Sequence, residues 1–435
     1  MHAYLRRVPK QLWSYPVSYP NPRAISCYVA NMKPTIAARA ALTAAVLAGA
    51  VSCGSDDATT NPGKPSIPDL DLAAVKTLAL DANESYGVMA NGLYTVVNGD
   101  VFGVDSRSGQ KLWWIQSPTT PVDKDKIQVL DSGRVLLVGW KDSPRLTAYD
   151  SGTGLQMWHT PAEQWFEADD SSGQFVHNDP RTGERRWSVD PGTVGCSTPL
   201  SKDPPALFDT DGATLTEPTG VLDPERPGVD VFRCAAPNGH YVVGGLDRTT
   251  GATAWHREVP EKGSFLRGPG HIGTIKTGGT VETIDMADGK SLGSRKPSSD
   301  KELHIPYADG SALTLDSYVI ADDKEMRLQE PDGKTRWTVP LDTKEEMQPL
   351  MVSSGNAVFT LMRQRADSDY KAWLIAYDTE NGHRTVVVGP GPTAAGEKPT
   401  LTMNLNAVGT QVRSAPWGLL VAGPDHGYAA IPVTR

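Results

Sequence analysis

Short apolar runs separated by polar turns fill the chain after residue 70. In the run that ends at Asp150, the apolar Leu146 and Ala148 alternate with polar neighbours. Runs of this length with a period of two predict β-strands. No stretch after residue 60 is long or apolar enough to span a bilayer. The pattern therefore predicts an all-β fold.

A motif of Asp, three residues, Gly, three residues and Trp recurs after such runs. Its four complete copies are Asp105, Gly109 and Trp113; Asp150, Gly154 and Trp158; Asp179, Gly183 and Trp187; and Asp247, Gly251 and Trp255. Three further copies are incomplete: Asp285 and Gly289 with Gly293 in the Trp place; Gln329 in the Asp place with Gly333 and Trp337; and Asp378 and Gly382 with Val386 in the Trp place.

Each residue type of the motif has a physical role in a strand–turn–strand unit. An Asp at the start of a tight connection accepts hydrogen bonds from backbone N–H groups two or three residues further on. Gly supplies the positive φ that the connection needs. The Trp begins the next strand, and its flat ring can fill the space between neighbouring sheets.

The spacing of the motif predicts the architecture. Successive copies lie 45, 29, 68, 38, 44 and 49 residues apart, mostly near the period of about 40 to 50 residues of a four-stranded propeller blade. The intervals of 29 and 68 together span two blades, which indicates a shortened third blade and an insertion near 188–237. The tail, 417–433, is expected to pair with the first strand near 73–80, which closes the ring and removes exposed edges. We expect a single β-propeller of four-stranded blades over 71–435, with eight blades, or seven as the alternative.

The front of the chain is typical of an export signal. From Met32, the basic Lys33 and Arg39 precede a short apolar run that ends at Val51. Residues 1–31 show no helical or strand period. Either the chain starts at Met32, or residues 1–31 are a long first part of the signal region that is removed with it. Residues 1–52 are therefore predicted to be a signal region and are set aside from the fold.

The end of this signal resembles a bacterial lipobox, in which small residues precede a Cys that is lipidated. Ala50, Val51 and Ser52 precede Cys53, whereas the usual pattern prefers Leu at the place of Ala50. Residues 53–70 are polar and rich in Pro and Gly, as expected of a flexible tether. The resemblance implies a lipid anchor on Cys53; the alternative is an ordinary cleaved signal in which Cys53 has no role.

Two cysteines remain in the body of the chain. Cys196 and Cys234 both lie within the predicted insertion. In an exported protein, two cysteines in one loop-rich segment are expected to form a disulfide. Two reduced, buried cysteines are the alternative. The stapled segment is also a candidate binding surface.

The charge of the body argues against nucleic acid as a partner. Residues 1–52 hold six basic and no acidic residues, so the remainder carries 36 basic against 51 acidic residues, a net charge of −15. Such a surface repels a phosphate backbone.

The recurring motif resembles the repeat of PQQ-like, quinoprotein-type propellers, and with the lipobox the chain is similar to the BamB-like group of envelope lipoproteins. That group carries no quinone and acts as a scaffold in outer-membrane protein assembly. Quinoprotein dehydrogenases contain a similar repeat, but they often carry a pair of adjacent Cys residues and a calcium site. This sequence has neither a Cys-Cys pair nor an acidic cluster with the spacing of a calcium loop. No catalytic residue, cofactor or metal is therefore expected.

Three functions remain open from sequence. The favoured one is a non-catalytic scaffold that binds other envelope or membrane proteins and is held by its lipid on the outer face of the plasma membrane, or on an outer membrane. The others are a binding module for a small ligand or glycan, and a PQQ-dependent dehydrogenase.

Overall fold

The computed structural model describes thirteen stretches of the chain, and all structural statements below concern them. They are residues 68–80, 85–117, 120–162, 174–197, 206–208, 220–221, 228–260, 263–268, 270–299, 302–316, 325–342, 345–364 and 371–434. These stretches belong to one compact unit, 63–435. Cys53 and the predicted signal region lie outside them. No helix within them is long and apolar enough to cross a membrane.

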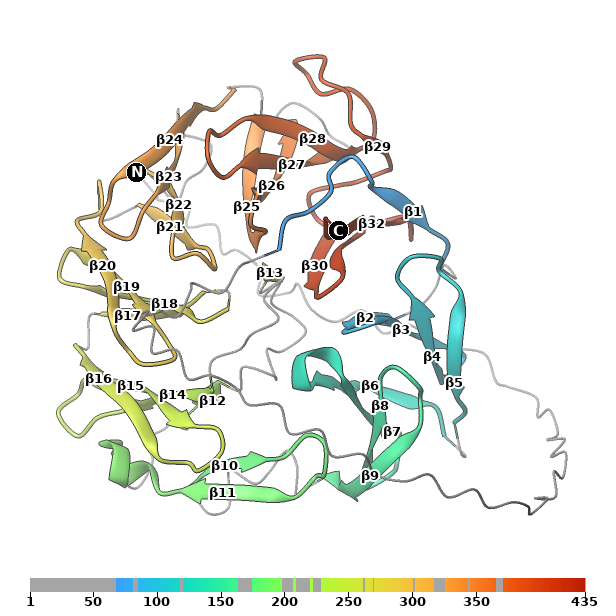
Figure 1. Ribbon diagram of the computed structural model, residues 1–435, viewed down its shortest axis with the longest axis vertical. Coiled ribbons are helices and arrows are strands. Elements are labelled where there is room, and N and C mark those ends of the chain that lie inside the picture. Colours follow the sequence, from blue (N-terminus) through green and yellow to red (C-terminus); the bar gives the residue numbers. More distant parts are fainter. Residues whose placement is uncertain are drawn as a thin grey trace, which may run out of the picture. The chain divides into compact units, whose positions relative to one another are not determined.

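The strands of the described residues form eight sheets, so the all-β prediction is confirmed (Figure 1). Sheet 1 contains β2 (Ser85–Met89), β3 (Gly92–Val97), β4 (Asp100–Asp105) and β5 (Lys111–Ile115). Sheet 2 contains β6 (Val122–Leu130), β7 (Val135–Trp140), β8 (Arg145–Asp150) and β9 (Gln156–Pro161). Sheet 3 contains β10 (Phe175–Asn178) and β11 (Arg185–Val189). Sheet 4 contains β12 (Ala206–Phe208), β14 (Val229–Ala235), β15 (Tyr241–Asp247) and β16 (Thr253–Val259).

The second half of the chain repeats this arrangement. Sheet 5 contains β17 (Ser264–Arg267), β18 (Ile272–Thr277), β19 (Thr280–Asp285) and β20 (Ser291–Arg295). Sheet 6 contains β21 (Leu303–Pro306), β22 (Ala312–Leu315), β23 (Glu325–Gln329) and β24 (Thr335–Pro340). Sheet 7 contains β25 (Glu345–Ser353), β26 (Ala357–Gln364), β27 (Ala372–Asp378) and β28 (Arg384–Gly389), flanked by β13 (Gly220–Val221) and β29 (Leu401–Thr402). Sheet 8 contains β30 (Gln411–Ala415), β31 (Gly418–Ala422), β32 (Tyr428–Pro432) and β1 (Lys76–Leu78).

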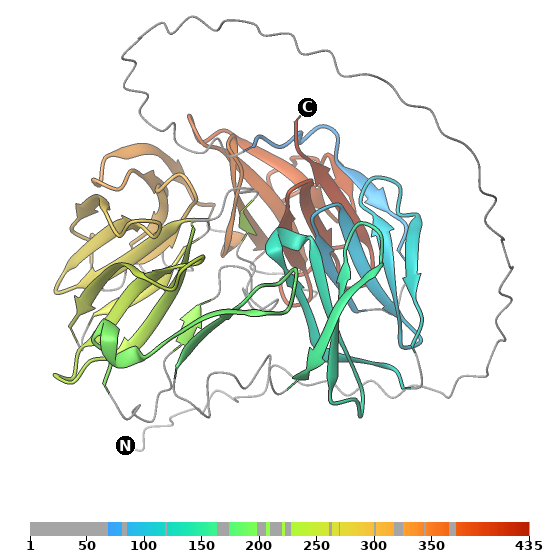
Figure 2. The same ribbon diagram turned by 60° about the horizontal axis from the view of Figure 1, so that its bottom comes forward.

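The two ends of the body pair as the sequence predicted. β1 runs antiparallel to β32, with Lys76 opposite Ala430 and Leu78 opposite Tyr428. Figure 2 shows β1 in blue at the edge of the red C-terminal strands. The first described strand is thereby the last strand of the last sheet.

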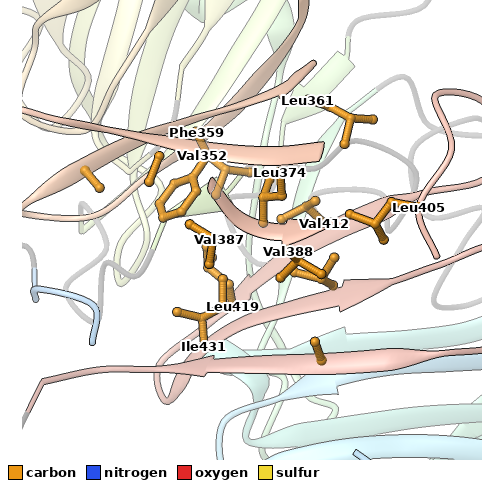
Figure 3. Close-up of a cluster of buried hydrophobic side chains, with 14 of the residues drawn as sticks. Val352, Phe359, Leu361, Leu374, Val387, Val388, Leu405, Val412, Leu419 and Ile431 are labelled. Carbon is orange, nitrogen blue, oxygen red and sulfur yellow. The ribbon is translucent and has the colours of Figure 1, made fainter. Parts of the chain in front are cut away.

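Apolar clusters join consecutive sheets. In the cluster between sheets 7 and 8, Phe359 and Leu374 face Leu419 and Ile431, all of them fully buried (Figure 3). Comparable clusters join sheets 1 and 2, 3 and 4, 4 and 5, and 6 and 7. A further cluster joins sheet 8 to sheet 1, where Leu420 and Tyr428 pack with Leu93 and Val104.

The motif residues lie where one sheet meets the next. The Asp of each complete copy accepts backbone N–H bonds within its own loop; Asp247 Oδ1, for example, accepts from the N–H of Thr249 at 3.0 Å and of Thr250 at 2.7 Å. Gly251 in the same loop has a φ of 73°, which a residue with a Cβ rarely adopts.

The Trp side chain of each complete copy contacts the loop of the following sheet. Its indole N–H donates to the carbonyl of the residue after that loop's Asp, at distances between 2.7 and 3.0 Å; the pairs are Trp113 with Ser151, Trp158 with Pro180, Trp187 with Arg248, and Trp255 with Met286. The ring also lies against the following loop's Gly: a Cβ on Gly289 would lie 2.7 Å from the Trp255 ring. Trp337 makes the same bond to Thr379.

A polar cluster stands where the motif lacks its Trp. Gly293 occupies the Trp place of sheet 5, and the side chain of Arg295 lies against Gly333 of the following loop instead. Arg295 is ion-paired to Glu302, and both side chains are nearly fully buried. Arg295 Nη2 lies 2.9 Å from Nδ1 of His304, whose Nε2 lies 3.3 Å from Thr274 Oγ1. Because the guanidinium can only donate, His304 accepts at Nδ1 and is neutral.

Part of the predicted insertion belongs to the sheets. β12 and β14 lie within 188–237 and form the first two strands of sheet 4. Between them, β13 reaches sheet 7, where Gly220 pairs in parallel with Val352 and Val221 with Ser353. A two-strand sheet 3 agrees with the short interval after Asp150.

The first prediction concerns the Trp contact. Replacing Trp255, which is 8% exposed, by Ala removes the packing on Gly289 and the bond to Met286, and should lower the free energy of unfolding by about 3–5 kcal/mol. Trp114, which is 55% exposed, is the matched control, and its change to Ala should cost about 1 kcal/mol. Urea unfolding measures both, and equal costs would contradict the role given to Trp255.

The second prediction concerns pH. Burial, followed by the positive charge of Arg295, lowers the pKa of His304 to about 4. Between pH 6.5 and 4 the unfolded chain then binds a proton that the folded chain does not, so stability present above pH 6.5 is lost as the pH falls towards 4. The loss should be on the order of 2 kcal/mol. His304→Gln, which keeps an acceptor for Arg295, should abolish it, whereas the exposed His256→Gln should not. Urea midpoints at pH 7 and pH 4.5 test this, and an unchanged pH dependence in His304→Gln would refute it.

Candidate functional site

A hollow of about 320 Å³ opens among the loops of sheets 1, 2 and 3. Asn91 comes from the β2–β3 turn, and Asp131 and Arg134 come from the 3₁₀ turn η1 (Asp131–Gly133) and the residue after it. Met157 comes from the start of β9, and Arg181 from the motif loop of sheet 3. The hollow is thus built from the ends of three successive repeats.

Charged groups line this hollow in a defined arrangement. Arg181 Nε donates to Asp131 Oδ2 at 2.6 Å, and this hydrogen bond raises the pKa of Arg181 further above its usual range. Asp150 is held in its loop by the N–H of Thr153 at 2.9 Å. The Arg134 side chain is exposed beside these groups. Donors and acceptors therefore stand together around a small opening.

The residue before the motif Trp differs between sheet 2, which lines the hollow, and sheet 6. In sheet 6 the residue before the motif Trp is Arg336, whose Nη2 lies 3.2 Å from Asp309 and 2.7 Å from Glu330. In sheet 2 that position is Met157, and Arg181 of the next sheet reaches Asp131 instead. The hollow can accept a polar small molecule or a side chain of a partner protein.

A buried charged cluster fixes sheet 3 to sheet 4. Asp230 is fully buried, with Oδ2 2.7 Å from Nδ1 of His177 and Oδ1 3.0 Å from Nε of Arg248. The His177 ring stacks on Trp187 at 5.4 Å between centroids. No motif marks His177 or Asp230 in the sequence, because the two residues lie 53 positions apart and meet only through the fold.

Cys196 and Cys234 are joined by a disulfide. Cys196 follows the 3₁₀ turn η2 (Pro191–Val194), and Cys234 lies on β14. The N–H of Ser197 donates to the carbonyl of Ala235 at 2.7 Å, and both cysteines are buried in the cluster between sheets 3 and 4. The bond therefore joins the two ends of the segment that contains β12 and β13.

The twelve residues of the complete motifs do not converge on one site, because the structure distributes them over successive sheet junctions. Within the described residues, no group of three His, Cys, Asp or Glu is placed to hold a metal ion.

The comparison with family models gives a match that agrees with this repeat geometry. The model described as outer membrane protein assembly factor BamB matches residues 97–223. Over these residues the chain is a PQQ-like repeat protein. The match covers the first three complete motifs, including the Trp113 and Trp158 contacts. None of the curated proteins matches the chain.

Solved structures similar to this PQQ-like repeat protein share little of its sequence. BamB from Moraxella catarrhalis is 15% identical, over 82% of this chain and 98% of that chain, with a TM-score of 0.39. The WD40 domain of SCAP from fission yeast is 9% identical, over 83% and 98%, with a TM-score of 0.44. Quinohemoprotein alcohol dehydrogenase from Comamonas testosteroni is 14% identical, over 85% and 77%, with a TM-score of 0.35. All three scores are below 0.5, so no argument rests on them.

The third prediction concerns the disulfide. Its loop spans 38 residues, and chain-entropy arguments assign about 4 kcal/mol of stability to closing a loop of that length. Replacing Cys196 and Cys234 together by Ser should lower the free energy of unfolding by that order. Denaturant unfolding with and without a reducing agent measures it: reduction should destabilise the native protein and leave the double variant unchanged. Equal stability of both proteins would overturn the assignment.

Proposed function

We propose that this protein is a non-catalytic scaffold that holds other proteins at the bacterial cell envelope. The observation that carries the proposal is the family match over 97–223, whose description names an assembly factor for outer membrane proteins. A BamB-like propeller suggests a protein-interaction scaffold in general terms. The loops and edges of repeated sheets offer such surfaces, and the role requires no reaction.

The scaffold is proposed to be one closed ring of eight blades. Two observations support it. Apolar clusters, Trp contacts or, after sheet 5, the Arg295 cluster connect sheets that follow one another in the chain. β1 also pairs with β32, so that sheet 8 contains both ends of the body. A closed ring leaves no unpaired first or last blade. Sheet 3, with two strands in the described residues, is the shortened blade.

The scaffold is further proposed to be exported and anchored by lipid on Cys53. The apolar run before Cys53 and the polar tether after it support this. The anchor places the protein on the outer face of the plasma membrane, or on an outer membrane where the organism has one.

A small-ligand module is the second candidate, and the hollow among sheets 1 to 3 is the observation that favours it. Its volume of about 320 Å³ is at the lower end for ligand pockets. Asn91, Arg134 and Asp131 would supply polar contacts there.

The fourth prediction is a crosslinking pull-down from the native envelope. The unaltered protein should remain with the membrane and yield a reproducible membrane-protein partner, and Cys53→Ala should release the protein and weaken that crosslink. Ser55→Ala, in the tether two residues after Cys53, is the matched control and should behave like the unaltered protein. The scaffold proposal is wrong if no specific partner is crosslinked and the purified protein binds PQQ or a sugar.

A further inference from the structure

One position on the last strand of the motif-bearing sheets can be compared along the chain. It is the residue directly after the Trp place of the motif. In five of the described sheets this residue is polar and exposed: His159, Ser188, His256, Ser294 and Thr338. Polar residues on a sheet edge discourage the addition of further strands.

Sheet 7 shows the opposite case. Its last motif strand, β28, is apolar, and Val387 at the register shift of this strand is fully buried. The chain's own β29 pairs in parallel with β28, with Val388 opposite Leu401, and Leu401 and Met403 pack on the cluster that contains Val387. In sheet 7 an apolar last strand is therefore covered by a further strand.

Sheet 1 has the apolar residue without the covering strand. Trp114 holds this position on β5 and is 55% exposed, and Leu112 on the same strand is 53% exposed. Among the described residues, no strand pairs with the outer side of β5. Trp114 is held in place, because its ring stacks on Phe102 at 6.1 Å and its Nε1 donates to Asp100 at 3.0 Å.

Basic side chains gather at the start of this edge. Lys111 Nζ lies 4.1 Å from the centre of the Phe102 ring, and Lys76 donates a hydrogen bond to the carbonyl of Arg107 in the adjoining loop. Asp105 in the same loop, which interacts with Arg107, and Asp100 beside Trp114 offset two of these three positive charges. The edge remains positive in a body with a net charge of −15, which favours an acidic group on whatever binds there.

We propose that β5 is a strand-addition site for an extended segment of a partner protein, with alternating apolar residues and an acidic residue that reaches Lys111 and Arg107. The segment adds to β5 as β29 adds to β28, and its apolar side chains cover Trp114 as Leu401 and Met403 cover Val387. Backbone hydrogen bonds give the affinity in this mode, and the alternate side chains give the specificity. The inference rests on the proposed scaffold function and gives it a site.

The chain itself supplies the probe. Residues 400–405, TLTMNL, alternate polar and apolar residues and contain β29. A labelled peptide of this sequence with an Asp at each end should bind the full-length protein in detergent. It should slow amide hydrogen exchange in residues 111–115 about tenfold. The same peptide with a Lys at each end should bind about tenfold more weakly.

Substitutions at the same repeat position separate the outcomes. Trp114→Ser, which removes the apolar ring without adding charge, should weaken binding of the acidic peptide about tenfold, and the matched His159→Ser on β9 should leave it unchanged. Thermal unfolding shows that both variants fold. Equal binding by both variants, or unchanged exchange in β5, overturns the proposal. Self-association that Trp114→Ser abolishes would assign the edge to a second copy, which also overturns it. An envelope partner that still crosslinks to Trp114→Ser leaves the scaffold function standing and removes only this site.

Discussion

The contact between one sheet's Trp and the next sheet's loop is the interaction on which the rest of the structure depends. A sheet of four short strands has two faces and cannot bury both by itself. The indole near the start of the last strand solves the problem, since its ring covers the following loop's Gly and its N–H satisfies a carbonyl in that loop. The Gly has to lack a Cβ for the ring to come so close, and its positive φ shapes the loop that presents the carbonyl. One contact therefore fixes the loop, the spacing of the sheets and the order in which they follow.

Where this contact is missing, other groups take its place. Arg295, Glu302 and His304 fill the junction after Gly293 with a buried ion pair and hydrogen bonds. At the junction from sheet 8 to sheet 1, Lys76 donates to the carbonyl of Arg107 in the following loop. A buried ion pair is a sensitive substitute for an indole, because removing either partner leaves an uncompensated charge. The repeat can thus lose its Trp without losing the junction, but the new junction responds to pH.

The sequence was sufficient for the elements that repeat. Asp105, Gly109 and Trp113 are recognisable because copies at regular intervals carry the same types, and the pairing of the tail with the first strand follows from the need to protect edges. The reach of β13 to sheet 7 was not predictable, since two residues in a long irregular segment carry no period. The His177, Asp230 and Arg248 cluster was missed for a different reason: each residue is ordinary in its local sequence, and only the fold brings their side chains together. The hollow is formed by loops of three sheets, and a pattern of residue types along the chain does not express how these loops meet.

Departures from the repeat carry the information about function. Some of them are compensated by other residues of the chain, and others are not. The loss of Trp at Gly293 is compensated by the Arg295 cluster, so it concerns stability. The apolar strand β28 is covered by β29, so its composition concerns folding. The hollow lies among loops of sheets 1, 2 and 3, and Trp114 lies on an apolar edge of sheet 1 that no described strand covers. Both features lie in or beside sheets 1 and 2, which the family match over 97–223 includes together with sheet 3. A scaffold built from equivalent sheets can distinguish its partners only through such differences. The surfaces of the first two sheets are therefore where recognition is expected, and the remaining sheets hold them in position.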